Sequence, residues 1–150
     1  MNKVLIITYY WPPGGGAGVH RWLKFSKYLP EYGYEPHILT VDSQYAAYPV
    51  TDISLENDIP AGVKVYKTRA TDYFRIYKRD KSKIPSAGFA AGDENNFRSK
   101  LLRFIRGNFF IPDPRKGWNR FAVKKACEII DNEKIRNIIT TSPPHSTQLI

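Results

Sequence analysis

A short apolar run that leads directly into a glycine-rich stretch constrains this chain more than any other feature. Residues 3–8 are nearly all β-branched or apolar, which is typical of a strand buried on both faces of a parallel sheet. Two prolines and five small residues follow, and they exclude regular structure until a helical pattern begins at Val19: Pro12, Pro13, Gly14, Gly15, Gly16, Ala17 and Gly18. The chain therefore opens with a strand, a glycine loop and a helix.

The later segments repeat this alternation. A helical face spans residues 19–29, further strands are predicted at 37–41, 63–66 and 136–141, and a helix runs from 118 or 119 to 132. The inward residues of the two helices are expected to be Val19, Trp22, Leu23, Ser26 and Leu29 in the first and Ala122, Ala126, Ile129 and Ile130 in the second. The order predicts one α/β domain over residues 1–150 with a Rossmann-like parallel sheet flanked by helices. We expect the strand at 136–141 to be buried, a helix capped by Ser142 to follow it, and the sheet to continue beyond Ile150.

The middle of the chain gives a different pattern. Residues 69–110 are predicted to form a mobile basic insertion with a cationic cluster at 75–83 and a helix at 97–108. These basic faces fit an anionic membrane surface, nucleic acid or a solvated charged face, and the last is favoured because basic helix faces are common. The net charge of +9 favours anionic partners without choosing among them.

Cysteine content and apolar runs limit the remaining classes. Cys127 is the single cysteine, so no intrachain disulfide can form. No secretory signal and no apolar run of spanning length occurs, which predicts a cytoplasmic protein, or one peripheral to the inner face of the membrane. The three histidines and Cys127 lack metal-ligand spacing, so no metal site is predicted.

The glycine loop is the first candidate site. Glycines permit sharp turns and close approach of a ligand, and the following helix offers free N–H groups to an anion. Neither glycine register completes G-x-G-x-x-G, because Val19 or Arg21 stands at the third position, and no Walker lysine follows. The alternative is a turn that merely requires glycine. His20 and Arg21, in the first turn of the helix, are candidates for contact with an acceptor or a phosphate.

The second candidate site is the stretch from Thr140 to Ser146. It follows a predicted strand and should reach the same sheet edge as the glycine loop. Ser142 and His145 are candidate contacts to a sugar, and a capping motif with an exposed histidine is an equal alternative. We expect His37 to be structural and Asp113 to stabilise the start of a helix.

These two segments carry a family resemblance. Residues 4–21, with Trp22-Leu23-Lys24-Phe25 and Tyr28-Leu29 after them, resemble the opening of family 4 glycosyltransferases of the GT-B fold. The stretch Thr141-Ser142-Pro143-Pro144-His145-Ser146 resembles a second segment of one bacterial subgroup. The resemblance involves both ends of the chain and no motif in residues 69–110.

The resemblance implies a retaining enzyme of two Rossmann-like domains, without a metal or other cofactor. This chain would be the incomplete N-terminal half, which binds the saccharide or lipid-linked acceptor in cell-surface polysaccharide synthesis. Gly14 to Gly18 would lie against the phosphate and sugar of the nucleotide-sugar donor and help to stabilise the leaving diphosphate. The Glu-x7-Glu motif of the donor half is not found here, and the family's histidine near the reacting sugar is expected beyond Ile150. Catalytic residues are therefore not assigned, and this chain alone should be inert.

Two other classes remain as alternatives. One is a nucleotide- or phosphate-binding Rossmann module without transferase activity, against which both fingerprint mismatches count. The other is a basic module that binds a membrane or nucleic acid, against which the position of the motifs at strand ends counts. We expect no nucleic-acid partner.

Overall fold

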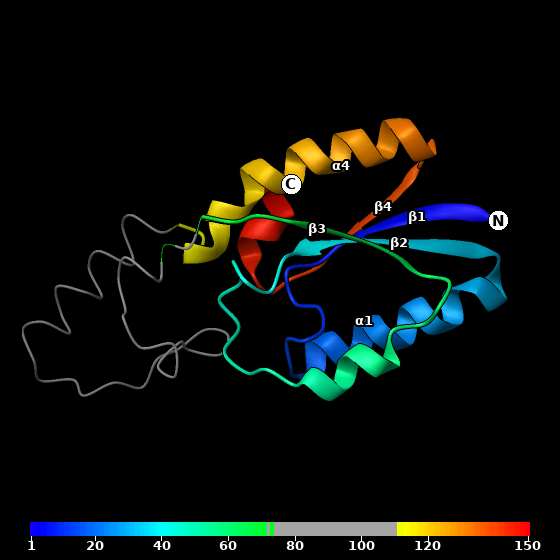
Figure 1. The fold of residues 1–150 in the computed structure, drawn as a ribbon. Coiled ribbons are helices and arrows are strands. Elements are labelled where there is room, and N and C mark those ends of the chain that lie inside the picture. The colour runs from blue at the N-terminus through cyan, green and yellow to red at the C-terminus, as the bar shows by residue number, and fades with distance from the viewer. Residues whose placement is uncertain (72, 74–110) are drawn as a thin grey trace, which may run out of the picture.

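A four-stranded parallel sheet forms the centre of the computed structural model, which describes residues 1–71, 73 and 111–150. Its strands are β1 (Asn2–Ile7), β2 (Tyr34–Val41), β3 (Lys64–Thr68) and β4 (Asn137–Thr140), in the order β3-β2-β1-β4 (Figure 1). All pairings are parallel, and in the β1–β4 pair Leu5 lies opposite Ile138 and Ile6 opposite Ile139. The predicted Rossmann-like α/β arrangement is confirmed.

Helices cover both faces of this sheet. The helix α1 (Ala17–Tyr28) follows β1 and lies on one face, and α4 (Asn119–Glu133) precedes β4 and lies on the other (Figure 1). Four short 3-10 helices complete the described part: η1 (Leu29–Tyr32), η2 (Ile53–Asp58), η4 (Pro114–Trp118) and η5 (His145–Leu149). The helices α1 and α4 thus belong to crossovers on opposite sides of the sheet.

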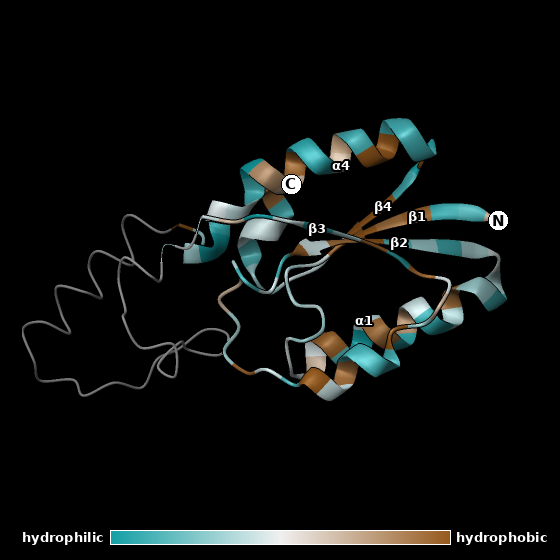
Figure 2. Ribbon diagram, viewed as in Figure 1, coloured by the Kyte–Doolittle hydropathy of each residue, from teal (hydrophilic) through white to brown (hydrophobic). Residues whose placement is uncertain are grey.

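The central strand β1 divides the core into two halves, because successive side chains point to opposite faces. Leu5 and Ile7 pack in the half that contains α4, and Val4 and Ile6 pack in the half that contains α1. Figure 2 shows the hydrophobic residues concentrated in the middle of the strands and on parts of both helices. The continuous apolar run of β1 follows from this burial on both faces.

The predicted inward faces of the helices are confirmed. Val19, Leu23 and Ser26 of α1 are buried, and the Ser26 hydroxyl donates to the Leu23 carbonyl at 2.9 Å. Trp22 and Leu29 pack against the same half of the core while remaining partly exposed. In α4 the buried residues are Ala122, Ala126 and Ile129, with Ile130 packed against them.

Two predictions near the end of the chain are wrong. The strand predicted as buried at 136–141 is β4, in which Ile138 is 49% and Ile139 36% exposed, because β4 is an edge of the described sheet. Ser142 does not cap a helix: Pro144 is the residue before η5, and the Ser142 hydroxyl lies 2.8 Å from Nδ1 of His145. The predicted helix at 97–108 and the basic cluster at 75–83 lie outside the described residues.

Candidate functional site

The glycine loop and the segment after β4 meet at one cavity. Since β1 and β4 are neighbouring parallel strands, the loops at their carboxyl ends share one edge of the sheet. The cavity has a volume of about 320 Å³. Its lining residues are Thr8, Tyr10, Gly15, Gly16, Ala17, Gly18, Val19, Arg21, Trp22, Pro49, Thr141, Ser142 and Pro143. The predicted convergence of both segments at one sheet edge therefore occurs in the structure.

The strand order explains why a cavity forms at this place. After β1 the chain crosses through α1 to β2 on one side, and β4 lies on the other side of β1. The helices of these crossovers cover opposite faces, so the loops that follow β1 and β4 diverge (Figure 1). In open α/β sheets such a reversal of strand order is where ligands bind.

The start of α1 contributes backbone donors to the cavity. Gly16 precedes the helix, and its carbonyl accepts the amide hydrogens of Val19 and His20 at 3.0 and 3.3 Å. Because glycine has no side chain, Gly16 cannot accept the amide hydrogens of the first turn, such as those of Ala17 and Gly18, through a side-chain cap. Both residues line the cavity, where these amides and the positive end of the helix dipole favour an anion.

The glycines of the loop have two different roles. A Cβ on Gly14 would lie 3.0 Å from the Trp11 carbonyl oxygen, and one on Gly15 would lie 3.0 Å from Cγ1 of Val50. These two positions therefore serve close packing inside the protein. Gly16 has φ of 105°, and a Cβ on Gly18 would meet nothing within 4 Å. Of the four glycines, only Gly16 and Gly18 both line the cavity and have open space where a Cβ would lie. Gly15 lines the cavity but is closely packed, and Gly14 does not line it.

The four predicted acceptor contacts separate into two groups. Arg21 and Ser142 line the cavity, whereas His20 and His145 are exposed and do not. His145 is close to the site only through its hydrogen bond with Ser142. Its role in this structure is therefore to hold that hydroxyl, and it does not form part of the cavity wall.

Sequence reasoning missed two aromatic residues of the cavity, Tyr10 and Trp22. The Arg115 guanidinium lies 5.4 Å from the centre of the Tyr10 ring and donates to the Ala47 carbonyl at 3.2 Å. Burial raises the pKa of Tyr10, and the nearby cation of Arg115 partly opposes this rise, so the group remains a neutral phenol. The available signal for Tyr10 was its place in the loop that follows β1, whereas no local sequence pattern pointed to Arg115.

Asp113 anchors the segment that follows β4. Its Oδ1 accepts from the Arg115 amide at 2.8 Å and from the Ser146 hydroxyl at 3.0 Å, and its Oδ2 accepts from the Ser146 amide at 2.8 Å. Asp113 is also the N-cap of η4. The predicted helix-stabilising role is confirmed, and the same carboxylate joins η4 to η5 close to the cavity.

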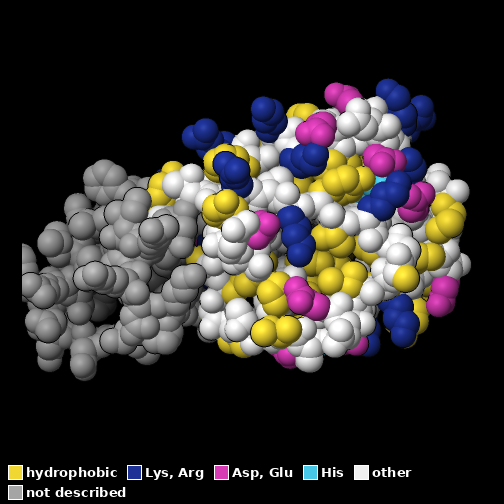
Figure 3. Space-filling view, viewed as in Figure 1, with side chains coloured by type: hydrophobic (Ala, Val, Ile, Leu, Met, Phe, Trp, Pro, Cys, Tyr) yellow, Lys and Arg dark blue, Asp and Glu magenta, His cyan; other side chains and the backbone are white. Residues whose placement is uncertain are grey.

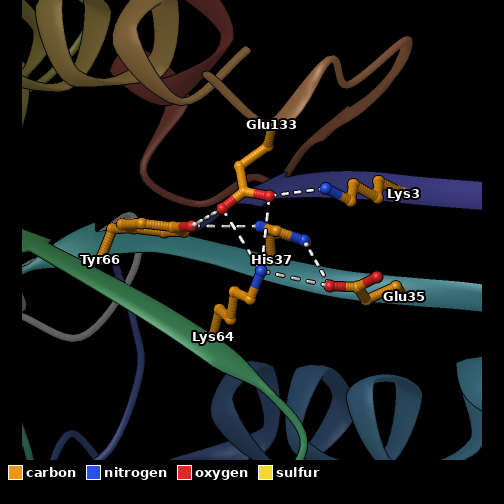
Figure 4. Close-up of polar contacts among 6 residues, drawn as sticks. All are labelled: Lys3, Glu35, His37, Lys64, Tyr66 and Glu133. Carbon is orange, nitrogen blue, oxygen red and sulfur yellow. Dashed lines mark hydrogen bonds and ion pairs between the residues drawn. The ribbon is translucent and has the colours of Figure 1, made fainter. Parts of the chain in front are cut away.

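A second polar cluster joins the C-terminal end of α4 to the three strands β1, β2 and β3. It consists of Lys3, Glu35, His37, Lys64, Tyr66 and Glu133 (Figure 4). Lys3 donates to Glu133 at 2.6 Å, and this bond together with Lys64 holds the pKa of Glu133 at about 2. His37 is fully buried with Nε2 3.0 Å from Glu35, and burial lowers the pKa of His37. These residues satisfy one another, which assigns them to stability and confirms the structural role predicted for His37.

No protein-family model, curated protein or solved structure matches this chain. Among residues 1–71, 73 and 111–150, no group of three His, Cys, Asp or Glu side chains could hold a metal ion. None of the helices in this part of the chain has the length and apolar character needed to cross a membrane.

Proposed function

We propose that this domain is the acceptor-side half of a retaining glycosyltransferase that uses a nucleotide-sugar donor, with a second domain supplying the donor-binding surface. The cavity between β1 and β4 is the observation that carries the proposal. In this proposal the start of α1 faces the donor phosphate, and the residues after β4 contact a saccharide. The amides of Ala17 and Gly18 would stabilise negative charge on the leaving diphosphate.

The chemistry of the cavity wall supports this assignment. Amide groups at a helix start suit phosphate, and Arg21 adds a cation. The hydroxyls of Thr141 and Ser142 lie on the other wall, where a hydroxyl-rich ligand would find both donors and acceptors. Tyr10 and Trp22 supply the apolar surface that a sugar ring needs for close contact.

A nucleotide-binding module without transferase activity is the second candidate. A module that binds a dinucleotide requires glycine at the third position of G-x-G-x-x-G, so that helix and strand can pack closely. Val19 stands at that position and is only 1% exposed within the core below β1. In such a module an acidic residue after the second strand binds the ribose, and Asp42, which directly follows β2, instead accepts the Gln44 amide at 3.0 Å in a turn. These two observations favour a sugar phosphate over a dinucleotide.

A titration of the chain with inorganic phosphate, a UDP-sugar and NAD, followed by amide NMR, tests the proposal. We expect phosphate and the UDP-sugar to shift the amide signals of residues 16–18, and the UDP-sugar alone to shift Ser142 as well. Preferential binding of NAD would replace the proposal with the nucleotide-binding module. A form of the protein that carries a donor-binding domain should also hydrolyse a nucleotide sugar slowly, whereas this chain alone should not.

A matched pair of variants makes the test specific to the cavity. Gly18→Asp adds a carboxylate on the wall, where the space is open and the helix start tolerates an acid. We expect phosphate binding to weaken roughly tenfold or more, because like charges a few Å apart repel strongly. His20→Asp places the same charge in the same helical turn but outside the cavity. Equal weakening by both variants would contradict a site at this wall.

A further inference from the structure

The outward face of α1 combines cations with large aromatic side chains. Arg21, Lys24, Phe25 and Tyr28 follow the spacing i, i+3, i+4, i+7, so they lie on one stripe of the helix. Phe25 is 52% and Tyr28 47% exposed, and Tyr32, one turn further along, is 77% exposed. A helix face that meets only water is normally polar, which makes these exposed aromatic residues an unusual feature. We call Arg21, Lys24, Phe25, Tyr28 and Tyr32 the outer stripe.

The charge of α1 is of a single sign. Residues 17–30 contain Arg21, Lys24 and Lys27 and no acidic residue. None of these three cations forms an ion pair within the described part of the chain. The Nζ of Lys27 lies 5.7 Å from the centre of the Tyr28 ring, which places a further cation beside the outer stripe. The face is therefore complementary to an anionic partner.

The helix on the other side of the sheet provides a comparison within the same molecule. The exposed residues of α4 carry both signs, and Lys125 pairs with Glu128 at 2.6 Å. Figure 3 shows Lys and Arg mixed with Asp and Glu on the α4 side. A mixed, paired surface of this kind is adapted to water. The unpaired cations of α1 therefore are not simply a consequence of the basic composition of the protein.

The outer stripe fits a bilayer better than it fits other anions. Its aromatic side chains are exposed on α1, a helix that covers one face of the sheet (Figure 1). Aromatic side chains with adjacent lysines are typical of helices that lie in the interface of a membrane. A nucleic-acid duplex would attract the same cations but would offer no apolar layer to Phe25.

We propose that α1 docks on an anionic lipid surface, with its cations at the headgroups and Phe25 and Tyr28 in the boundary with the acyl chains. The helix would lie flat, because its opposite face, with Val19, Leu23 and Ser26, remains buried against the sheet. Since the cavity lies at the N-terminal end of the same helix, docking would hold the cavity close to the membrane surface. This proposal does not depend on the transferase function.

Binding of the chain to lipid vesicles tests the proposal directly. We expect binding to vesicles of equal parts phosphatidylglycerol and phosphatidylcholine, weakening as salt is added, and little binding to phosphatidylcholine alone. Trp22 reports on the contact because its ring centre lies 5.5 Å from that of Phe25, whereas Trp11 and Trp118 are at most 1% exposed. Lipids with a quencher near the headgroup should therefore reduce tryptophan emission.

Charge-matched variants separate α1 from the general basic character of the protein. Lys24→Ala with Lys27→Ala should weaken vesicle binding by roughly twentyfold or more, since each cation near the surface contributes about fivefold. Lys67→Ala with Lys124→Ala removes the same charge from exposed positions elsewhere and should change binding by less than about threefold. Equal losses in both pairs would overturn the proposal.

The aromatic contribution has its own variant. Phe25→Ser removes a half-exposed ring that makes no buried contact in the core clusters, so folding should persist, as circular dichroism can verify. We expect about fivefold weaker binding to anionic vesicles and unchanged binding to a DNA duplex. Absence of vesicle binding at low salt, or vesicle binding unaffected by Phe25→Ser, would overturn membrane docking in favour of a general polyanion surface.

Discussion

Gly16 is the residue whose backbone conformation shapes the cavity. Its φ of 105° and ψ of 168° lie in a region that residues with a Cβ rarely adopt. We expect Gly16→Ala to lower the free energy of unfolding by about 1–3 kcal/mol, measured by urea denaturation, because the new Cβ strains this conformation. Gly18→Ala, two residues later and inside the helix, should be neutral or stabilising. Equal stability of both variants would show that the loop relaxes without strain.

Single residues also show how far the sequence could predict the site. Five small residues in succession identified the loop, and their position after a buried strand placed it at the correct sheet edge. The sequence could not separate the glycines by role, because Gly14 and Gly15 are confined by Trp11, Tyr48 and Val50, and two of these lie more than thirty residues away in the chain. Such contacts depend on tertiary packing and leave no local pattern.

At the scale of elements, Asp113 links the two short helices behind the cavity. Asp113→Ala removes the N-cap of η4 and leaves the amide of the buried Ser146 without its acceptor. We expect a loss of about 1–3 kcal/mol in the free energy of unfolding. The displaced segment should also reduce the shift that a UDP-sugar causes at Ser142. Asp131→Ala, at an exposed position of α4, should change stability by less than about 0.5 kcal/mol.

The elements near Asp113 also explain where sequence prediction failed. Strand β4 has the apolar pattern of a buried strand, yet burial depends on what lies beside and above a strand, which its own residues do not encode. The serine before two prolines resembled an N-cap, but the Ser142 hydroxyl bonds the imidazole three residues later. By contrast, α1 and α4 were predicted closely because their helical periodicity reflects burial on a single face.

At the scale of the whole molecule, the polar cluster of Figure 4 ties β1, β2, β3 and α4 together, and none of its residues lines the cavity. Its members come from four separate parts of the sequence, and Lys3 and Glu133 are 130 residues apart. No sequence pattern could predict these pairs. Because Glu133 bonds Lys3, Lys64 and Tyr66 together, one carboxylate connects α4 to both β1 and β3.

The pKa of Glu133 makes this connection dependent on pH. In the folded state the pKa is about 2, against an ordinary value of 4.5, so the unfolded chain binds the proton more readily. The contribution of Glu133 to stability should therefore be complete above pH 4.5 and disappear as the pH falls to about 2. Burial also lowers the pKa of His37 below 6.5, so the unfolded chain takes up this proton more readily than the folded protein. Through His37, stability should therefore begin to fall already as the pH drops below about 6.5, before the effect of Glu133 sets in.

The variant Glu133→Gln separates these two contributions. It should be less stable than the parent at neutral pH, and the two proteins should converge as the pH approaches 2, in urea unfolding measured at a series of pH values. The fall in stability that begins near pH 6.5 should remain in the variant and become somewhat larger. Burial, which lowers the pKa of His37, is unchanged, whereas the nearby Glu133 charge that opposes this lowering is removed. Glu128→Gln, whose exposed Lys125 partner lies in the same helix, should leave the profile nearly unaltered. A constant difference between Glu133→Gln and the parent at every pH would instead mean that the carboxylate stabilises the molecule by shape and hydrogen bonding, independent of its charge.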